Sequence, residues 1–183
     1  MESIYKLGFE ELYVNGGIVA ASEAVISSVV PLDSELLIIG NVASIDEWRA
    51  VCHKLSIVAS VIDNDGSTSD LICAVEAILA SNNHISHIIC GSERCEACLA
   101  AIGMLARKYK RSFIVVDTTD CVEAVNMKLL NVDFLISNTG NITARRNKLV
   151  QTEGNARTSG QDIYAMWQRS MSHRCATLEP MAC

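Results

Sequence analysis

Acidic and small polar residues follow the apolar runs of this chain, at positions where they could bind a ligand together. Asp63 and Asp65 follow one run, and Asp117 ends another. A carboxylate can accept two hydroxyl donors, and an acid at the end of the second strand binds ribose in nucleotide-binding folds. The alternative is that these acids only form turns and cap helices. We predict a cofactor-binding edge made of Gly40, Asn41, Asp63, Asp65, Gly91, Ser92, Glu93 and Asp117.

Three cysteines with regular spacing form a second candidate site. Cys90, Cys95 and Cys98 have the C-x4-C-x2-C spacing of plant-type ferredoxin ligands, and Cys121 could be a fourth ligand. However, Cys98 falls inside a predicted helix, whereas that spacing needs an irregular loop for the sulfur atoms to converge. We therefore favour reduced, buried thiols over a metal site. A single redox-reactive thiol at Cys95 is a further alternative.

Nucleophilic catalysis finds no support in the spacing of cysteine and histidine. His84 and His87 precede a predicted strand, whereas Cys95 and Cys121 follow strands. The histidines and cysteines are therefore expected at opposite edges of the sheet, too far apart for a catalytic pair. The catalytic residues, if the chain is an enzyme, stay unknown from the sequence.

Five apolar runs that alternate with helical patterns must position these residues. The runs are continuously apolar, as in strands that are covered on both faces, and the alternation with helices indicates a parallel sheet. We predict an α/β fold, a three-layer Rossmann-like domain with a mostly parallel sheet of five or more strands flanked by helices. Sequence leaves the strand order open, including a flavodoxin-like order. The five strands are expected near residues 35–40, 57–63, 87–91, 112–117 and 132–137.

The helix boundaries follow from capping residues and breakers. Residues 1–15 are expected to be irregular, and a helix over 18–30 ends against Pro31. The other expected helix starts are Ser44 with Glu47, Ser67 with Asp70, Ser92, Thr118 or Thr119, and Ser159 with Asp162. The helix after 117 should run to Leu130, and residues 138–160 read as a long loop or an irregular hairpin.

The order of elements over residues 16–140 resembles class I S-adenosylmethionine-dependent methyltransferases. The resemblance implies that Asp63 holds the ribose, that Gly40 lies near the amino-acid end, and that Ser92 or Glu93 faces the adenine of S-adenosylmethionine. Residues 112–141 are also similar to a plant family of uncharacterised methyltransferase-like proteins. The turn after the first strand, 40–44, has one glycine where that family has several, which implies a degenerate member.

Three functional hypotheses follow from these observations. The first is a methyltransferase-like enzyme that binds S-adenosylmethionine. The second is a noncatalytic interaction or regulatory module on a Rossmann-like scaffold, and the third is a cysteine-based metal or redox protein. The first expects a small-molecule ligand, the second expects self-association or a protein partner, and the third expects bound zinc or iron.

Length, composition and charge indicate the domain organisation and argue against nucleic-acid binding and membrane insertion. The 183 residues favour one domain over 1–172 with a flexible tail at 173–183. The net charge of −6 argues against nucleic acid, and no apolar run is long enough for a membrane span. The N-terminus has no signal-peptide pattern, so a cytoplasmic location is expected. Trp48 and Trp167 could form a homodimer contact, although a packed core explains them equally well.

Overall fold

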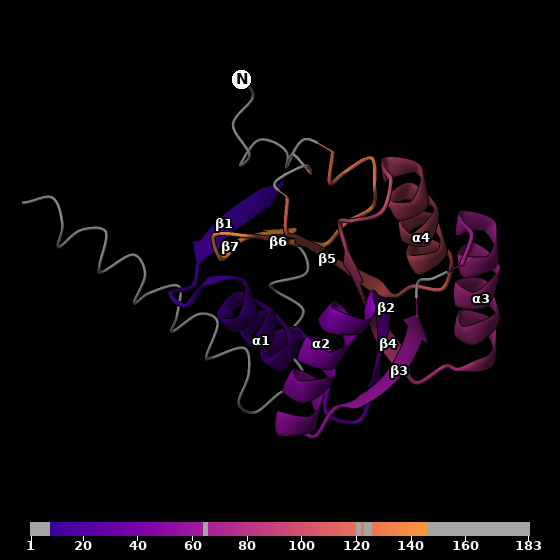
Figure 1. Cartoon of the computed structure of the whole chain (residues 1–183), viewed down its shortest axis with the longest axis horizontal. Helices are drawn as coiled ribbons and strands as arrows, with labels where there is room; N and C mark the ends of the chain where they lie inside the picture. The colour runs from indigo at the N-terminus through magenta and orange to yellow at the C-terminus, as the bar shows by residue number, and fades with distance from the viewer. Residues whose placement is uncertain (1–7, 64–65, 120–121, 123–125, 146–183) are drawn as a thin grey trace, which may run out of the picture.

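A computed structural model of the chain describes residues 8–63, 66–119, 122 and 126–145. It contains a single seven-stranded sheet in the order β1-β7-β6-β5-β4-β2-β3, flanked by helices (Figure 1). The predicted three-layer α/β fold with a mostly parallel sheet is confirmed. The elements are β1 (Phe9–Tyr13), α1 (Gly17–Val29), β2 (Glu35–Gly40), α2 (Val42–Lys54), β3 (Val58–Asp63), α3 (Thr68–Ser81), β4 (Ile85–Gly91), α4 (Glu96–Lys108), β5 (Ser112–Asp117), β6 (Phe134–Ser137) and β7 (Asn141–Arg145).

Six of the seven strands point the same way. β3, β2, β4, β5 and β6 pair in parallel, β7 runs antiparallel to β6, and β1 runs antiparallel to β7. β1 is therefore parallel to the five central strands. The carboxyl ends of these six strands lie along one edge of the sheet, which we call the carboxyl edge.

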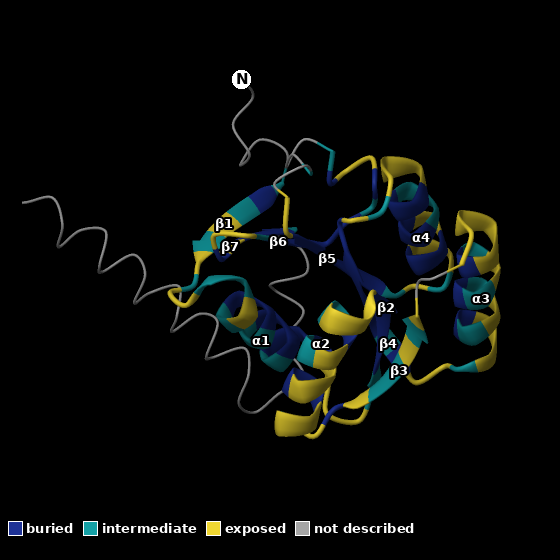
Figure 2. Ribbon diagram, in the orientation of Figure 1, coloured by how far each residue is buried: buried dark blue, intermediate teal, exposed yellow. Residues whose placement is uncertain are grey.

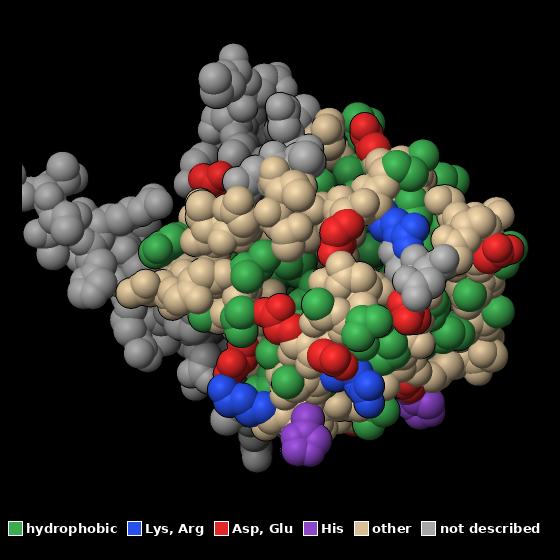
Figure 3. Space-filling view, viewed as in Figure 1, with side chains coloured by type: hydrophobic (Ala, Val, Ile, Leu, Met, Phe, Trp, Pro, Cys, Tyr) green, Lys and Arg blue, Asp and Glu red, His purple; other side chains and the backbone are tan. Residues whose placement is uncertain are grey.

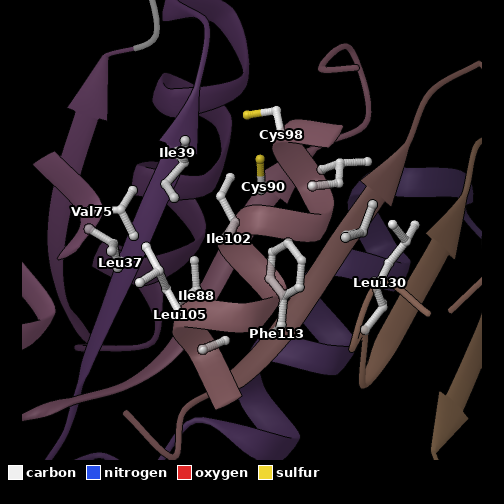
Figure 4. Close-up of a cluster of buried hydrophobic side chains, with 14 of the residues drawn as sticks. Leu37, Ile39, Val75, Ile88, Cys90, Cys98, Ile102, Leu105, Phe113 and Leu130 are labelled. Carbon is white, nitrogen blue, oxygen red and sulfur yellow. The ribbon is translucent and has the colours of Figure 1, made fainter. Parts of the chain in front are cut away.

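Two helix layers bury the sheet on both faces. Because side chains alternate along a strand, Leu37 and Ile39 of β2 face α3 and α4, whereas Leu36 and Ile38 face α1 and α2. Figure 4 shows the α4 side of this core, where Ile102 and Leu105 pack over the sheet. The central strands are buried along their length, whereas the edge strand β3 is largely exposed (Figure 2).

β1 corrects the expectation that residues 1–15 are irregular. Its five residues, Phe-Glu-Glu-Leu-Tyr, carry two acids and only Phe9 is buried. A strand at the edge of a sheet tolerates charged side chains, which also discourage pairing with another chain. The apolar signal that revealed the central strands is therefore missing here.

Three helix starts differ from the sequence expectation, and one is confirmed. Asn41 caps α2 in place of Ser44, since its side chain accepts a 3.0 Å hydrogen bond from the Ser44 amide. α4 begins after Cys95, not at Ser92. No helix follows β5 within the described residues, where 126–131 form a turn. Ser67 caps α3 as predicted and accepts a 3.2 Å hydrogen bond from the Asp70 amide.

Of residues 138–160, expected as a long loop or an irregular hairpin, the structure describes 138–145. Residues 138–140 form a turn, and 141–145 form β7, which pairs antiparallel with β6. The predicted helix from Ser159 and the predicted tail at 173–183 lie outside the described residues. Within the part of the chain that the structure describes, no helix is both long enough and apolar enough to cross a membrane.

Candidate functional site at the carboxyl edge

Those predicted site residues that the structure describes lie along the carboxyl edge, because each of them ends a strand or follows one. Asp63 ends β3, Gly40 ends β2, Gly91 ends β4 and Asp117 ends β5. Gly40 and Asp63 are register partners in neighbouring strands. Asp65 lies outside the described residues.

Ser92 and Asp117 form the buried centre of this edge. The Ser92 hydroxyl donates a 2.6 Å hydrogen bond to Asp117 Oδ1, and the Ser92 amide donates to the carbonyl of Val116 at 2.9 Å. Asp117 is 1 % exposed. Its carboxylate also accepts the amide and hydroxyl of Thr119 and, at 2.7 Å, the amide of Val122. Asp117 thus holds Thr119 and Val122 against the end of β5.

Asn41 and Glu93 form a second pair, one strand farther along. Glu93 Oε1 accepts a 3.0 Å hydrogen bond from Asn41 Nδ2 and a 3.3 Å hydrogen bond from the Ser44 hydroxyl. A carboxylate at a helix start is stabilised by the helix dipole. The chain's own Glu93 therefore occupies the place at the start of α2 where an anionic ligand could otherwise bind.

Gly91 makes room for this arrangement. A Cβ atom at position 91 would lie 1.9 Å from Glu93 Oε2. Gly40 is similarly packed, since a Cβ there would lie 3.3 Å from the ring of Trp48. Trp48 is buried, so its ring lies directly beneath the edge.

A third part of the edge was missed by sequence reasoning. The turn between β6 and β7 lies against the start of α1: a Cβ at Gly140 would be 2.9 Å from the Val14 carbonyl oxygen and 3.1 Å from Gly17 Cα. The Val14 amide donates to the Gly140 carbonyl at 3.2 Å. This contact joins residues far apart in the sequence, and the glycines at 16, 17 and 140 were its only sequence signal.

The hydroxyl groups of this turn are close to one another. Ser137 Oγ and Thr139 Oγ1 are 2.8 Å apart, and Asn141 donates its amide to Ser137 Oγ and its side-chain Nδ2 to Thr139 Oγ1. One hydroxyl hydrogen is used between the two oxygens, which leaves the other able to donate to an anion. α1 begins beside them at Gly16 with no side-chain cap and no acid in its first turn. Backbone N–H groups at such a helix start favour an anion.

The cysteine site is not assembled in the described residues. Cys90 and Cys98 are buried and Cys95 is exposed, while Cys121 lies outside the described residues. Figure 4 shows the Cys90 sulfur pointing toward Cys98 within the apolar core. Burial raises the pKa of both thiols, which keeps them neutral. Among the residues described, no group of three or more possible metal ligands occurs.

Basic side chains are dispersed over the face that Figure 3 shows. They lie there in small separate groups, without a continuous basic patch. His87 lies in the first half of β4, at the opposite edge from Cys95, as the sequence predicted.

Comparison with known proteins identifies relatives of a different kind from those expected. No family model matches the chain. The chain is 27% identical over 177 residues to a 2-aminoethylphosphonate–pyruvate transaminase of Salmonella paratyphi C, and the match covers 88% of this chain and 48% of that protein. It is 29% identical over 164 residues to a bifunctional phosphonoacetaldehyde hydrolase/aminoethylphosphonate transaminase of Clostridioides difficile, covering 79% of this chain and 25% of that protein. The chain thus spans half or less of these relatives.

Solved structures agree on the fold. A ureidoglycine–glyoxylate aminotransferase of Bacillus subtilis superposes with a TM-score of 0.66 at 14% identity, over 88% of this chain and 47% of that chain. A pyridoxamine–pyruvate aminotransferase of Mesorhizobium loti superposes with a TM-score of 0.63 at 14% identity, over 87% of this chain and 45% of that chain. A PLP-bound C–S lyase of Staphylococcus hominis superposes with a TM-score of 0.61 at 14% identity, over 91% of this chain and 52% of that chain. At this identity the likeness establishes the fold alone.

These findings correct the functional hypotheses. The resemblance to class I methyltransferases is wrong, and S-adenosylmethionine is not the cofactor that the relatives indicate. The resemblance rested on element order, which many α/β proteins share. The noncatalytic module and the cysteine-based metal or redox protein do not fit either, since the relatives are enzymes named for transamination or C–S bond cleavage.

Proposed function

We propose that this chain binds pyridoxal 5′-phosphate, or its amine form pyridoxamine 5′-phosphate, at the carboxyl edge and takes part in amino-group transfer between small amines and 2-oxo acids. The names of the transaminase relatives and the PLP-bound lyase support the cofactor class and the reaction. The observation that carries the proposal is the meeting, at one edge, of a buried carboxylate and a helix start without a side-chain cap, beside two hydroxyl groups of which one keeps a hydrogen to donate.

The donor groups at this edge fit the two ends of the cofactor. A buried carboxylate such as Asp117 is the partner that stabilises a protonated pyridine nitrogen. The start of α1, with the hydroxyls of Ser137 and Thr139, suits a phosphate. Ser137 is the register partner of Asp117, so the phosphate site and the ring site lie on adjacent strands. When bound, the cofactor supplies a carbon atom that can carry an amino group from one substrate to another.

The carboxylate of Asp117 is already positioned by the chain itself. Ser92, Thr119 and Val122 donate to its two oxygens and hold it in one orientation. A ring cation would therefore meet a carboxylate that does not need to reorient. Glu93 blocks the start of α2, and α4 carries Glu96 in its first turn, so the start of α1 is the better anion site.

Binding can be followed through Trp48, whose ring lies beneath the edge at Gly40. With Trp167→Phe as the background, titration with either form of the cofactor should quench Trp48 fluorescence in a saturable way. Thr139→Asp places a carboxylate where the phosphate is expected and should weaken binding at least tenfold. Leu32→Asp is the matched control, since Leu32 is exposed and precedes β2 at the opposite edge.

Equal affinities for Thr139→Asp and Leu32→Asp would remove the phosphate site from the start of α1. Absence of saturable quenching at millimolar cofactor, in the parent protein, would overturn the proposal as a whole.

A further inference from the structure

The described lysines are all remote from the carboxyl edge. Pyridoxal-phosphate enzymes hold the aldehyde form through a bond from a lysine amine to the cofactor. A lysine that does this must reach the ring, and here the ring partner is Asp117. The structure describes four lysines: Lys54, Lys108, Lys110 and Lys128.

Lys54 and Lys108 lie at the far ends of helices and are paired. Lys54 ends α2 and its Nζ is 2.5 Å from Glu23 Oε1. Lys108 ends α4 and pairs with Glu76. Since α2 and α4 begin at the carboxyl edge, their last residues lie at the opposite edge.

Lys110 and Lys128 lie in turns that lead into strands. Lys110 is in the turn before β5, and Lys128 is in the turn 126–131 before β6. That second turn is fixed near the start of β5, because the Asp133 amide donates to the Phe113 carbonyl at 2.8 Å. Both lysines are therefore placed at the amino ends of the parallel strands.

The carboxyl edge carries acids instead. Asp63, Glu93 and Asp117 lie along it. Among the described residues next to the carboxyl ends of the parallel strands, Arg94 is the one cation, because Lys128 lies at the far end of the connection from β5 to β6, and Arg94 is itself engaged within the chain. An ammonium group at this edge is therefore better accommodated than an uncharged aldehyde.

We infer that this edge holds the cofactor reversibly, with no covalent bond to the chain, and that it binds pyridoxamine 5′-phosphate at least as tightly as pyridoxal 5′-phosphate. This inference rests on the proposed function. Both forms share the phosphate and ring contacts. The aldehyde form loses the bond that a lysine would add, and the amine form keeps its attraction to the carboxylates.

The experiment compares the parent protein with two added lysines. Asn138→Lys places an amine in the exposed β6–β7 turn, next to Ser137 and thus one strand from Asp117. Leu129→Lys is the matched control, because Leu129 is 74% exposed in the turn before β6 at the opposite edge. Each protein is mixed with pyridoxal 5′-phosphate, treated with borohydride and mapped by peptide mass spectrometry. A lysine Nζ that condenses with the aldehyde forms a C=N bond and releases water, and borohydride reduces that bond.

We expect the parent and Leu129→Lys to show only substoichiometric labelling spread over exposed lysines. Asn138→Lys should be labelled stoichiometrically at 138. Fluorescence titration of the parent should give an affinity for the amine form equal to or greater than that for the aldehyde form. Dialysis should remove the aldehyde form from the parent protein.

Stoichiometric labelling of the parent at any lysine, including Lys6 or Lys148, would overturn the inference while leaving the proposed function intact. A tenfold preference of the parent for the aldehyde form would also overturn it. If neither form binds and Asn138→Lys is labelled no more than Leu129→Lys, the proposed function itself fails, and the inference fails with it.

Discussion

The Ser92 hydroxyl lies 2.6 Å from Asp117 Oδ1, and this hydrogen bond joins the carboxyl ends of β4 and β5. Both residues are buried, Ser92 at 7 % and Asp117 at 1 % exposure. A hydrogen bond to a buried charge is stronger than one between neutral groups because little water competes for it. The pair therefore stabilises the edge and orients the carboxylate at once.

Ser92→Ala should lower the free energy of unfolding by about 1.5–3 kcal/mol, the usual contribution of a hydrogen bond to a charged group. Urea denaturation measures the change. Ser27→Ala is the matched control, because the Ser27 hydroxyl bonds only the Ala24 carbonyl among its described contacts, within its own helix. The control should change stability by less than about 0.5 kcal/mol. Equal losses in the two variants would contradict a special role for the Ser92–Asp117 bond.

Alkaline pH should destabilise the protein through the thiol of Cys52. Burial raises the pKa of this thiol to about 11, above its ordinary value of 9.0. The folded state thus binds the proton more tightly than the unfolded state, so this contribution is complete below pH 9 and is lost as the pH rises through about 11. The slope for one such group approaches about 1.4 kcal/mol per pH unit.

The measurement is the free energy of unfolding at several pH values between 8 and 11, for the parent and for Cys52→Ala. The variant removes the titrating thiol, so its stability should fall less steeply over this range. Parallel curves for the two proteins would show that Cys52 does not contribute to the pH dependence.

The central strands could be predicted from sequence because each is buried on both faces. Burial on both faces forces a continuous apolar run, as in 112–117, where every residue is buried. The same principle explains the failure at β1, an edge strand in which only Phe9 is buried and two of the five residues are acidic. The placement of Gly40, Asp63, Gly91 and Asp117 at one edge also followed from the sequence, since parallel strands align their carboxyl ends.

The cofactor could not be predicted in the same way. Its expected binding groups depend on the contact of Gly140 with Gly17, which is made because β7 folds back between β6 and β1. Nothing in the local pattern specifies that strand order. The turn at 137–141 could be recognised as polar, but its position beside a helix start is a tertiary property. The acids at the strand ends therefore favour ribose, and the hydroxyl-rich turn reads as an ordinary polar turn after a strand.

Gly91→Ala should be tolerated despite its apparent clash. The nearest atom to a new Cβ is Glu93 Oε2, at 1.9 Å, which is the far end of a flexible and exposed side chain. Glu93 can rotate away, at the cost of its hydrogen bonds to Asn41 and Ser44. We expect a loss of less than about 1 kcal/mol in urea denaturation, typical of exposed hydrogen bonds. A larger loss would show that Glu93 cannot move and that its carboxylate is a fixed part of the edge.

Gly103→Ala should destabilise the protein, although its added Cβ would come as close to a neighbouring atom as the Cβ added at position 91. A Cβ at position 103 would lie 1.9 Å from the carbonyl oxygen of Leu130, which belongs to the backbone of the turn that precedes β6. Leu130 and Ile102 are both buried in the core between α4 and the sheet, so neither element can retreat without opening a cavity. In an exposed helix the same change would stabilise by about 1 kcal/mol, because alanine favours the helix. Here we expect a loss of about 1–3 kcal/mol, as for other overpacked cores. Urea denaturation of Gly103→Ala, measured together with Gly91→Ala and the parent, shows whether the free energy of unfolding falls or rises. A Gly103→Ala protein as stable as the parent would mean that α4 is not held against this turn.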